Sequence, residues 1–233
     1  MTDPRVLLIT GASTGIGAAT AEAAVERGWK VALAARSENK LRELAERLGE
    51  DNALAARCDV TNWDDQQRLV AATIGRFGRV DAAFANAGFG AKRGFLEEDP
   101  VQWRELVLTN VLGPALTIRA VLPHFLENDR GHMLITSSVA GRRALPGSLY
   151  SASKHAATAI GEALRAELRQ MHQNTTIRVT LIEPGMVDTP FFDNKPEGAL
   201  EPPDIAAAVM YALEQPSRVD VNQILIRPVK QPI

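Results

Sequence analysis

The stretch Thr10-Gly11-Ala12-Ser13-Thr14-Gly15-Ile16-Gly17 decides the fold of this 233-residue chain. It follows the apolar run Val6–Ile9 and spaces its glycines as G-x-x-x-G-x-G. Backbone without Cβ atoms can approach a pyrophosphate closely, and the helix that follows directs unpaired N–H groups and its positive dipole end at the phosphates. The alternative is a purely structural turn. A place between the first strand and the first helix favours a dinucleotide site over that alternative.

Short β-branched runs alternate with longer amphipathic stretches outward from this loop. We expect strands at Val6–Thr10, Lys30–Ala35, Ala53–Cys58, Val80–Asn86, His132–Ser138, Ile177–Glu183 and Gln223–Ile226. We expect helices at Gly15–Arg27, Glu38–Leu48, Trp63–Phe77, Pro100–Leu126, Ser151–Met171 and Pro203–Glu214. This alternation predicts right-handed βαβ units and a parallel sheet covered on both faces.

The expected fold class is therefore α/β, with a Rossmann-type doubly wound parallel sheet of about seven strands and helices on both faces. We expect a single domain over residues 1–233, with a cofactor half at roughly 1–90 and a catalytic and substrate half at roughly 91–233. In such sheets ligands bind beyond the carboxyl ends of the strands. Functional residues are therefore sought in the segments that follow the strands.

Composition and charge exclude several classes of protein. Lys and Arg total 26 against 28 Asp and Glu, so the net charge is -2, and neither half carries a long cationic block. We therefore expect no nucleic acid and no membrane as partners. The lone cysteine, Cys58, excludes an intramolecular disulfide and a Cys-based zinc cluster. No apolar run approaches the ~18–20 residues that span a bilayer, and no signal-peptide pattern is present, so the expected compartment is the cytoplasm.

Two helices carry sequence signals for a boundary or a bend. Thr61 and Asp64 have the spacing of a capping box, which predicts Thr61 as an N-cap. Pro114 lies four residues after Asn110 and has no N–H to donate to the Asn110 carbonyl. We expect the helix to bend there and leave that carbonyl free; the alternative is an ordinary proline kink without further function.

Ribose recognition is expected at the end of the second strand, ~20 residues after the glycine loop. The sequence there reads Ala34-Ala35-Arg36-Ser37, without the carboxylate that would hold a ribose 2′-hydroxyl. The Arg36 guanidinium matches a 2′-phosphate in charge and geometry, which favours NADP(H) over NAD(H). The alternative is a solvated arginine before a helix.

Tyr150 and Lys154 stand at i and i+4, on one face of an expected helix. A cation at ~4–5 Å is worth about 3–4 kcal/mol at an effective dielectric of ~20. That interaction would lower the tyrosine pKa by two to three units from ~10 and make a usable general acid/base. The alternative is a packed tyrosine beside a solvated lysine.

With these motifs in place, the chain resembles the short-chain dehydrogenase/reductase family over nearly its whole length, as an NADP-preferring member of bacterial type. The matching residues are Thr10–Gly17, Asp59, Asn86-Ala87-Gly88, Asn110, Ser137-Ser138, Tyr150, Lys154 and Pro184-Gly185 with Thr189. The resemblance implies an NADP(H)-dependent oxidoreductase that interconverts a small-molecule carbonyl and an alcohol by hydride transfer. It also implies a homodimer or homotetramer.

The resemblance also implies a role for individual residues. Tyr150 would be the general acid/base, and Lys154 would lower its pKa and bind the nicotinamide ribose. A serine at the end of the fifth strand would hold the substrate oxygen, and the Asn110 carbonyl would hold a water that links the lysine to solvent. Cofactor contacts are expected from Gly11, Ser13, Thr14, Gly15, Ile16, Gly17, Arg36, Ser37, Asp59, Val60, Asn86, Ala87, Gly88, Tyr150, Lys154, Pro184, Gly185, Val187 and Thr189.

Two departures from the family pattern bear on the site. The active serine usually precedes the tyrosine by thirteen residues, which selects Ser137, whereas alignment on the Ser-Val-Ala-Gly turn selects Ser138. Adjacent strand residues point to opposite faces, so one of the two faces the substrate, and we expect Ser138. The stretch from Thr189 to Pro203 is short and contains Pro190-Phe191-Phe192, which predicts an open or partly covered substrate site.

Other readings of the chain remain open. A regulatory protein could bind NADP(H) without turnover, although none of the expected catalytic residues is missing, and a lyase or an epimerase could share the fold. The pairs Lys92-Arg93 and Arg142-Arg143 either attract an anionic substrate or are solvated loop charges. The histidines show no metal-ligand spacing, so no metal site is expected.

Overall fold

The apolar runs of the sequence form one central sheet. The computed structural model describes residues 4–146, 149–172, 175–192 and 196–231, and in these ranges seven strands pair in the order β3-β2-β1-β4-β5-β6-β7. Their bounds are β1 Val6–Thr10, β2 Lys30–Ala35, β3 Ala53–Arg57, β4 Ala82–Ala85, β5 His132–Thr136, β6 Arg178–Pro184 and β7 Gln223–Ile226. All pairs are parallel. The order reverses between β1 and β4, the position at which doubly wound sheets bind ligands.

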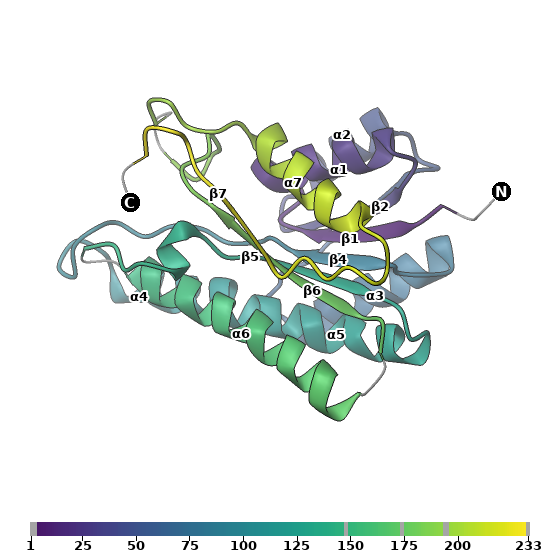
Figure 1. Cartoon of the computed structure of the whole chain (residues 1–233). Helices are drawn as coiled ribbons and strands as arrows, with labels where there is room; N and C mark the ends of the chain where they lie inside the picture. The colour runs from purple at the N-terminus through teal and green to yellow at the C-terminus, as the bar shows by residue number, and fades with distance from the viewer. Residues whose placement is uncertain (1–3, 147–148, 173–174, 193–195, 232–233) are drawn as a thin grey trace.

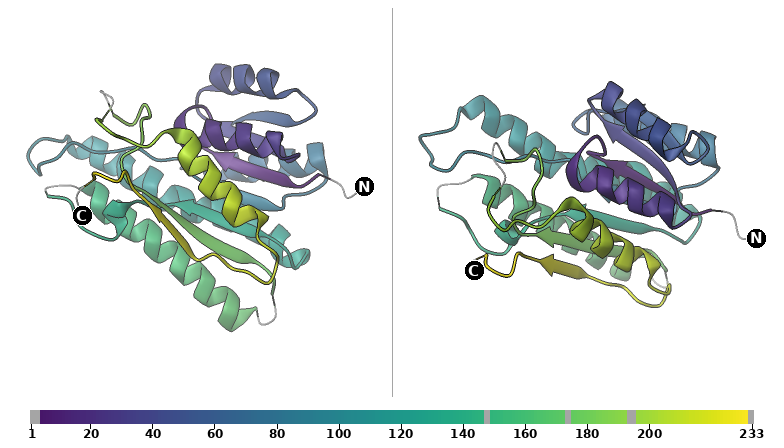
Figure 2. Two further views of the ribbon diagram at one scale, coloured as in Figure 1. Left: turned by 45° about the horizontal axis from the view of Figure 1, so that its top comes forward. Right: turned by 90° about the horizontal axis from the view of Figure 1, so that it is seen from above.

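Helices cover both faces of the sheet, as Figures 1 and 2 show. Their bounds are α1 Gly15–Glu26, α2 Glu38–Leu48, α3 Trp63–Phe77, α4 Pro100–Val107, α5 Gly113–Glu127, α6 Leu149–Met171 and α7 Pro202–Glu214. One apolar cluster joins the sheet to α1, α2 and α7, and a second joins its other face to α3, α5 and α6. β1 is buried throughout because both of its faces are covered. The predicted α/β fold class with a doubly wound parallel sheet is confirmed.

Three strands end earlier than the sequence suggests, β3 by one residue, at Arg57. The strand expected at Val80–Asn86 is Ala82–Ala85, and the one expected at His132–Ser138 is His132–Thr136. The N–H of Asn86 leaves the ladder and donates to the Thr10 hydroxyl at 3.1 Å. Asn86 has therefore left the ladder, whereas the Ser137 N–H still donates to the Ile182 carbonyl of β6 at 2.8 Å and Ser138 keeps an extended backbone.

The single long helix expected at Pro100–Leu126 is wrong in form. α4 gives way to a π-helical turn at Leu108–Leu112, in which the Gly113 N–H bonds the Leu108 carbonyl five residues back, and α5 follows. The interruption lies where Pro114, which lacks an N–H, was expected to disturb the helix. Widening the turn by one residue keeps the chain helical through this point; the expected bend stays a prediction.

The N-cap expected at Thr61 is also wrong. The Asn62 side chain caps α3 by accepting the Asp65 N–H, while the Thr61 hydroxyl donates to Asp59 Oδ1 at 2.8 Å. Thr61 is unavailable as a cap because the Asp59 turn engages its hydroxyl. Sequence spacing did not reveal that competition.

The stretch Pro100–Glu127 qualifies, by length and apolar composition alone, as a helix that would cross a membrane. The sequence analysis expected no such run. α5 packs against β4, α3 and α6, so its inner apolar side chains belong to the core. Buried core helices pass the same compositional test, which makes this stretch weak evidence for a membrane span.

Candidate active site

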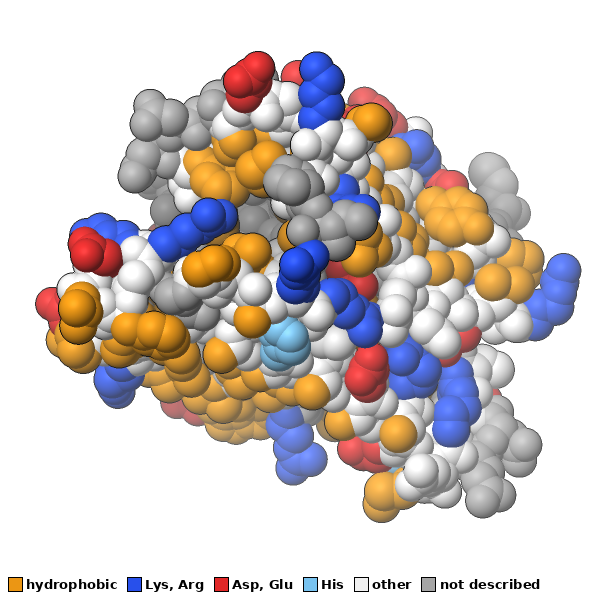
Figure 3. All heavy atoms as spheres, turned by 60° about the vertical axis from the view of Figure 1, so that its left-hand side comes forward, with side chains coloured by type: hydrophobic (Ala, Val, Ile, Leu, Met, Phe, Trp, Pro, Cys, Tyr) orange, Lys and Arg blue, Asp and Glu red, His pale blue; other side chains and the backbone are white. Residues whose placement is uncertain are grey.

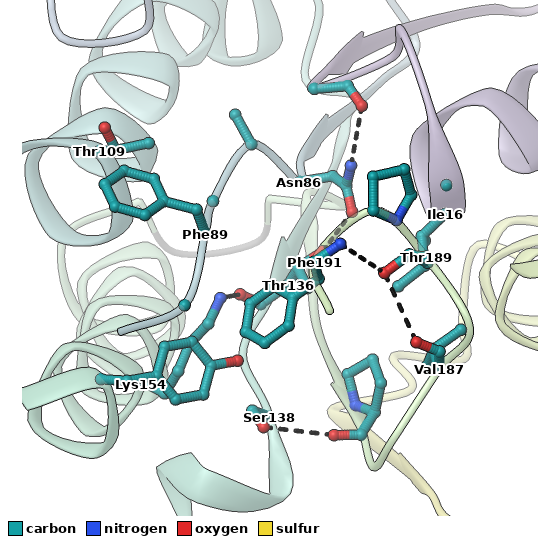
Figure 4. Close-up of a pocket in the computed structure, with 18 of the residues that line it drawn as sticks. Ile16, Asn86, Phe89, Thr109, Thr136, Ser138, Lys154, Val187, Thr189 and Phe191 are labelled. Atoms are coloured by element: carbon teal, nitrogen blue, oxygen red, sulfur yellow. Dashed lines mark hydrogen bonds between the residues drawn. The ribbon is translucent and has the colours of Figure 1, made fainter. Parts of the chain in front are cut away.

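A cavity of about 540 Å³ opens at the carboxyl ends of the strands. The segments that follow β1 to β6 all contribute to its lining. Figure 4 shows side chains from these separate segments directed at one another across the cavity. The structure thus brings together stretches that lie far apart in the sequence, as the strand order requires.

The glycine loop after β1 packs tightly against the segment after β4. Gly11 and Gly15 have φ of +66° and +56°, a region that favours glycine. A Cβ on Gly11 would lie 2.8 Å from the Ala87 Cα, and a Cβ on Gly17 would lie 2.3 Å from the Gly11 carbonyl oxygen. Gly17 does not line the cavity; it lets α1 begin close behind the turn.

The N-terminus of α1 faces the cavity with uncapped backbone groups. Thr14, its N-cap residue, makes no side-chain capping bond, and the first turn carries no acidic residue. Ser13, Thr14, Gly15 and Ile16 line the cavity there. Uncapped N–H groups and the positive end of a twelve-residue helix suit an anion, so this end of the cavity fits the phosphates of a dinucleotide.

Asn86 joins the ends of three strands beneath this loop. Its Nδ2 donates to the Thr10 carbonyl at 3.2 Å, and its Oδ1 accepts the Thr136 hydroxyl at 3.1 Å (Figure 4). Ala87 and Gly88 follow it along the cavity wall. Asn86 thus ties the strand ends together, and all three residues lie at the cavity, where cofactor contacts were expected.

Arg36 marks the far end of the cavity, together with Ser37, Asp59 and Val60. Its side chain is exposed and makes no hydrogen bond or ion pair with the part of the chain that the structure describes. Burial raises the pKa of Asp59, but hydrogen bonds from Thr61 and the nearby charge of Arg36 outweigh it, so the pKa is lowered overall. A guanidinium without a bonded partner at the cavity edge is available to an anion.

Ser138, and not Ser137, turns toward the reaction end of the cavity. The Ser137 hydroxyl is buried against α6, 3.0 Å from the Lys154 carbonyl and 2.7 Å from the Thr158 hydroxyl. The Ser138 hydroxyl donates to the Pro184 carbonyl at 3.3 Å (Figure 4) and favours the ionised form of the Tyr150 side chain. Ser138 keeps an extended backbone, so its side chain and that of Ser137 point to opposite sides, as in a strand.

The pKa expected for Tyr150 is wrong in direction. Burial raises it to about 12, and the Ser138 hydrogen bond opposes only part of that rise. The Lys154 ammonium donates to the Thr136 carbonyl at 2.9 Å and lies 5.7 Å from the centre of the tyrosine ring. Burial lowers the pKa of Lys154 to about 8, so the cation that was expected to acidify the phenol itself holds its charge weakly. Desolvation thus dominates both groups.

Asn110 is buried beside the cavity rather than in its lining. Its Nδ2 donates to the Phe89 carbonyl at 2.9 Å and to the Ser153 hydroxyl at 3.1 Å, and its Oδ1 accepts the Phe89 N–H at 3.1 Å. The side chain therefore fixes the segment after β4 against α6, next to Lys154. The water expected at its backbone carbonyl stays a prediction.

Phe191 is a residue to which the sequence analysis assigned no role. Its ring lies edge-on to Tyr150 with centroids 5.4 Å apart, and to Phe192 at 5.0 Å. A Cβ on Gly90 would come within 2.7 Å of it. The ring thus covers Tyr150, which makes the site partly covered; residues 193–195 of the same stretch lie outside the described residues. Spacing alone carried no signal for this contact.

The two basic pairs have different surroundings. Arg142 bonds the buried Glu183 carboxylate at 2.7 Å, so it is not a free loop charge. Arg93, Lys92 and Arg143 are all exposed, and of these three Arg93 lines the cavity. Among the described residues, no three His, Cys, Asp or Glu side chains are grouped to hold a metal ion.

Cavity-lining residues outside the catalytic and cofactor-contact residues expected from the sequence come mostly from the same loops as the expected ones. They are Ala35, Cys58, Phe89, Gly90, Ala91, Arg93, Thr109, Thr136, Ser137, Val139, Ala140, Leu145, Met186, Pro190, Phe191, Phe192 and Gln231. Gln231 differs because it comes from the C-terminal tail, far in sequence from every motif.

Known proteins share this sequence and architecture. A family model described as short chain dehydrogenase matches residues 5–199. An uncharacterized oxidoreductase from Staphylococcus saprophyticus is 41% identical over 233 residues, 97% of each chain. An alcohol dehydrogenase from the archaeon Thermococcus sibiricus, complexed with 5-hydroxy-NADP, superposes with a TM-score of 0.90 at 32% identity over 99% of each chain. A 3-ketoacyl-(acyl-carrier-protein) reductase from Brucella melitensis, complexed with NADH, gives 0.89 at 29% over 98% of each. The chain therefore belongs to the short-chain dehydrogenase/reductase family of oxidoreductases.

Proposed function

We propose that the protein is an NADP(H)-dependent oxidoreductase that interconverts a small-molecule carbonyl and an alcohol. The observation that carries this proposal is the convergence of Tyr150, Ser138 and Lys154 on one end of a cavity whose other end holds the uncapped α1 N-terminus and Arg36. One cavity thus combines an anion-binding end with a proton-donating end. That combination suits a phosphate-bearing cofactor laid beside a reacting oxygen.

The residues of the cavity fit a dinucleotide. The uncapped first turn of α1 offers backbone N–H groups to the phosphates, and Arg36 offers a charge-assisted contact to a 2′-phosphate. Gly185, Val187 and Thr189, which follow β6, also line the cavity, and Thr189 packs against Gly15 at the start of α1. When bound there, the cofactor supplies the hydride. The solved relatives carry an NADP derivative in one case and NADH in another, and Arg36 is our reason to propose NADP(H) here.

Tyr150 is the proposed proton donor in the reducing direction. A phenol whose pKa is raised to about 12 keeps its proton at neutral pH, which is the form a general acid requires. Ser138 holds the substrate oxygen beside the Tyr150 hydroxyl and stabilises the charge that develops on it. Lys154 restrains the site through its bond to Thr136 and, while protonated, favours the tyrosinate that proton transfer leaves behind.

The two serines allow a matched test of this arrangement. Ser138→Ala removes a hydroxyl that faces the reacting oxygen, so we expect kcat/KM to fall about 100-fold with little change in Tm. Ser137→Ala removes bonds to Lys154 and Thr158 in the core, so we expect it to cost about 1–2 kcal/mol in unfolding free energy with a much smaller change in kcat/KM. Steady-state kinetics and chemical denaturation of both variants measure the contrast. The reverse pattern would identify Ser137 as the substrate-facing serine.

A non-catalytic NADP(H) sensor and a lyase or epimerase are the rival functions. A panel of ketones and aldehydes with NADPH, followed by absorbance at equilibrium, separates them. Oxidation of NADPH with at least one carbonyl supports the oxidoreductase. Tight NADPH binding without oxidation by any member of the panel supports the sensor, and product formation without net NADPH oxidation supports the lyase or epimerase.

We also propose that the protein assembles as a homodimer or homotetramer in the cytoplasm. Exposed apolar side chains occur before α4, on α4 and in the π-helical turn that follows it, at Phe95, Leu96, Val101, Val107 and Leu112. Figure 3 views the end of the molecule where the strands finish and shows hydrophobic side chains gathered at its lower left. Apolar patches of this kind favour association. Localisation of a tagged chain by microscopy tests the compartment.

Two substitutions that introduce charge test whether the chain forms an oligomer through this apolar surface. We expect Val107→Glu combined with Leu112→Glu to convert the oligomer to a monomer, because burying two carboxylates in an apolar contact is costly. Light scattering coupled to size exclusion measures the mass, with the exposed Met171→Glu as the control. An unchanged mass in the double variant would place the interface elsewhere.

A further inference from the structure

The side chain of Gln231 reaches from the C-terminal tail into the wall of the cavity. Its Oε1 accepts the Met186 N–H at 3.0 Å, and its own N–H closes a turn on the Pro228 carbonyl at 3.0 Å. The residue is half-buried and lines the cavity, whereas its neighbour Lys230 is exposed and does not. The tail that follows β7 is therefore part of the site.

Gly185 shows how closely this side chain approaches the backbone. A Cβ on Gly185 would lie 2.1 Å from Gln231 Oε1 and 3.1 Å from its Cδ. Gly185 does not have the positive φ that by itself selects glycine. A Cβ there would displace the end of the Gln231 side chain from Met186, so this contact depends on glycine at position 185.

The backbone that contacts Gln231, at Gly185 and Met186, follows the end of β6 and is held by a few hydrogen bonds. The last ladder bond of β6 is the one from the Gly185 N–H to the Ile226 carbonyl, at 2.7 Å. The next N–H, on Met186, has Gln231 as its partner. On the other side of Gly185, the Pro184 carbonyl accepts the Ser138 hydroxyl at 3.3 Å. A shift of this backbone would therefore move the Pro184 carbonyl and with it the Ser138 hydroxyl that is bonded to it.

We propose that Gln231 is a positioning residue of the active site, which fixes the Pro184–Met186 backbone and through it the Ser138 hydroxyl. The proposal rests on the proposed function for its kinetic consequences. Its structural part, the bond from Met186 to the tail, stands independently. The role requires an acceptor oxygen on a side chain long enough to reach the Met186 N–H. Substitutions that change the length or remove the acceptor should therefore break this hydrogen bond.

Hydrogen exchange at the Met186 amide, followed by NMR on the whole chain, tests the bond without any turnover. We expect Gln231→Ala to speed exchange at this amide about tenfold, the effect of losing roughly one hydrogen bond. Gln231→Asn is one methylene too short to reach and is expected to behave like the alanine variant. Gln231→Glu keeps both the length and an acceptor oxygen, so exchange stays slow. Lys230→Ala is the matched control. Unchanged exchange in Gln231→Ala would overturn the proposal.

Kinetics then test the consequence at Ser138. We expect Gln231→Ala and Gln231→Asn to lower kcat about tenfold while Tm moves by less than about 2 °C, and Gln231→Glu to restore most of kcat. Rescue by glutamate but not by asparagine is a result that simple loss of stability would not produce. Slower turnover in all three variants alike, or in none, would contradict the positioning role. Absence of turnover in the unmodified protein would instead refute the proposed function and leave the exchange result valid.

Discussion

Tyr150→Phe is expected to lower kcat/KM for carbonyl reduction about 1,000-fold. The substitution removes the hydroxyl that donates the proton and keeps the ring that packs against Phe191. General acid catalysis contributes typically 10²–10⁴-fold, and the phenylalanine side chain has no proton to donate in its place. Steady-state rates with NADPH and the best carbonyl of the panel measure the effect. NADPH binding, followed by fluorescence titration, is expected to change by no more than about threefold, because phenylalanine preserves the shape of the wall.

The chain offers a matched control in Tyr211, which is exposed on α7 and does not line the cavity. Tyr211→Phe removes the same atom from the other tyrosine and is expected to leave kcat/KM unchanged. Turnover of Tyr150→Phe within tenfold of the unmodified protein would refute Tyr150 as the proton donor. It would also remove the central argument for the oxidoreductase.

The rate of carbonyl reduction by the unmodified protein should depend on pH through Tyr150 and Lys154. Tyr150 stays protonated up to a pKa of about 12, so the acid itself is present throughout the neutral range. Lys154 loses its charge above its pKa of about 8, and with it the cation that stabilises the tyrosinate. Reduction is therefore expected to slow as pH rises through about 8. The residual rate of Tyr150→Phe should lack this limb, because no tyrosinate forms.

Arg36→Asp is expected to shift the preference for NADPH over NADH by about 100- to 1,000-fold toward NADH. The substitution removes a guanidinium that has no bonded partner in the described chain and would reach a 2′-phosphate. A charge-assisted bond of this kind is worth about 1.5–3 kcal/mol, and a carboxylate adds repulsion. The same carboxylate accepts a hydrogen bond from an unmodified 2′-hydroxyl, as acidic residues at this position do in NAD-binding folds. The ratio of kcat/KM values for the two cofactors measures the shift.

Arg57→Asp controls for a general loss of positive charge at this end of the cavity. Arg57 is exposed, acts on the same Asp59 carboxylate through its charge and does not line the cavity. We expect it to change the cofactor ratio by less than about threefold, since exposed charges act weakly over a distance. Equal shifts in the two variants would show that Arg36 acts through the general field and not by direct contact. An unchanged ratio in Arg36→Asp would remove the argument for NADP(H).

Local patterns were enough to predict the architecture and most of the cavity. The glycine spacing of Gly11–Gly17, the alternation of strands and helices, and the step from Tyr150 to Lys154 are short-range features. Each can therefore be interpreted from residues within one turn or on one helix face. Arg36 follows from its place after the second strand, because parallel strands bring their carboxyl ends to one edge, whereas Asp59 and Thr189 were expected from the resemblance to the family.

Tertiary structure alone decided the rest, because the interactions concerned depend on burial and on contacts between distant segments. Ser138 was expected from the turn alignment, but its hydrogen bond to the Pro184 carbonyl, 46 residues away, depends on the pairing of β5 with β6. The pKa values of Tyr150 and Lys154 are set by desolvation, which sequence spacing does not report. Phe191 over Tyr150 and Gln231 beneath Met186 arise only when the chain after β6 and the tail after β7 fold onto the same cavity.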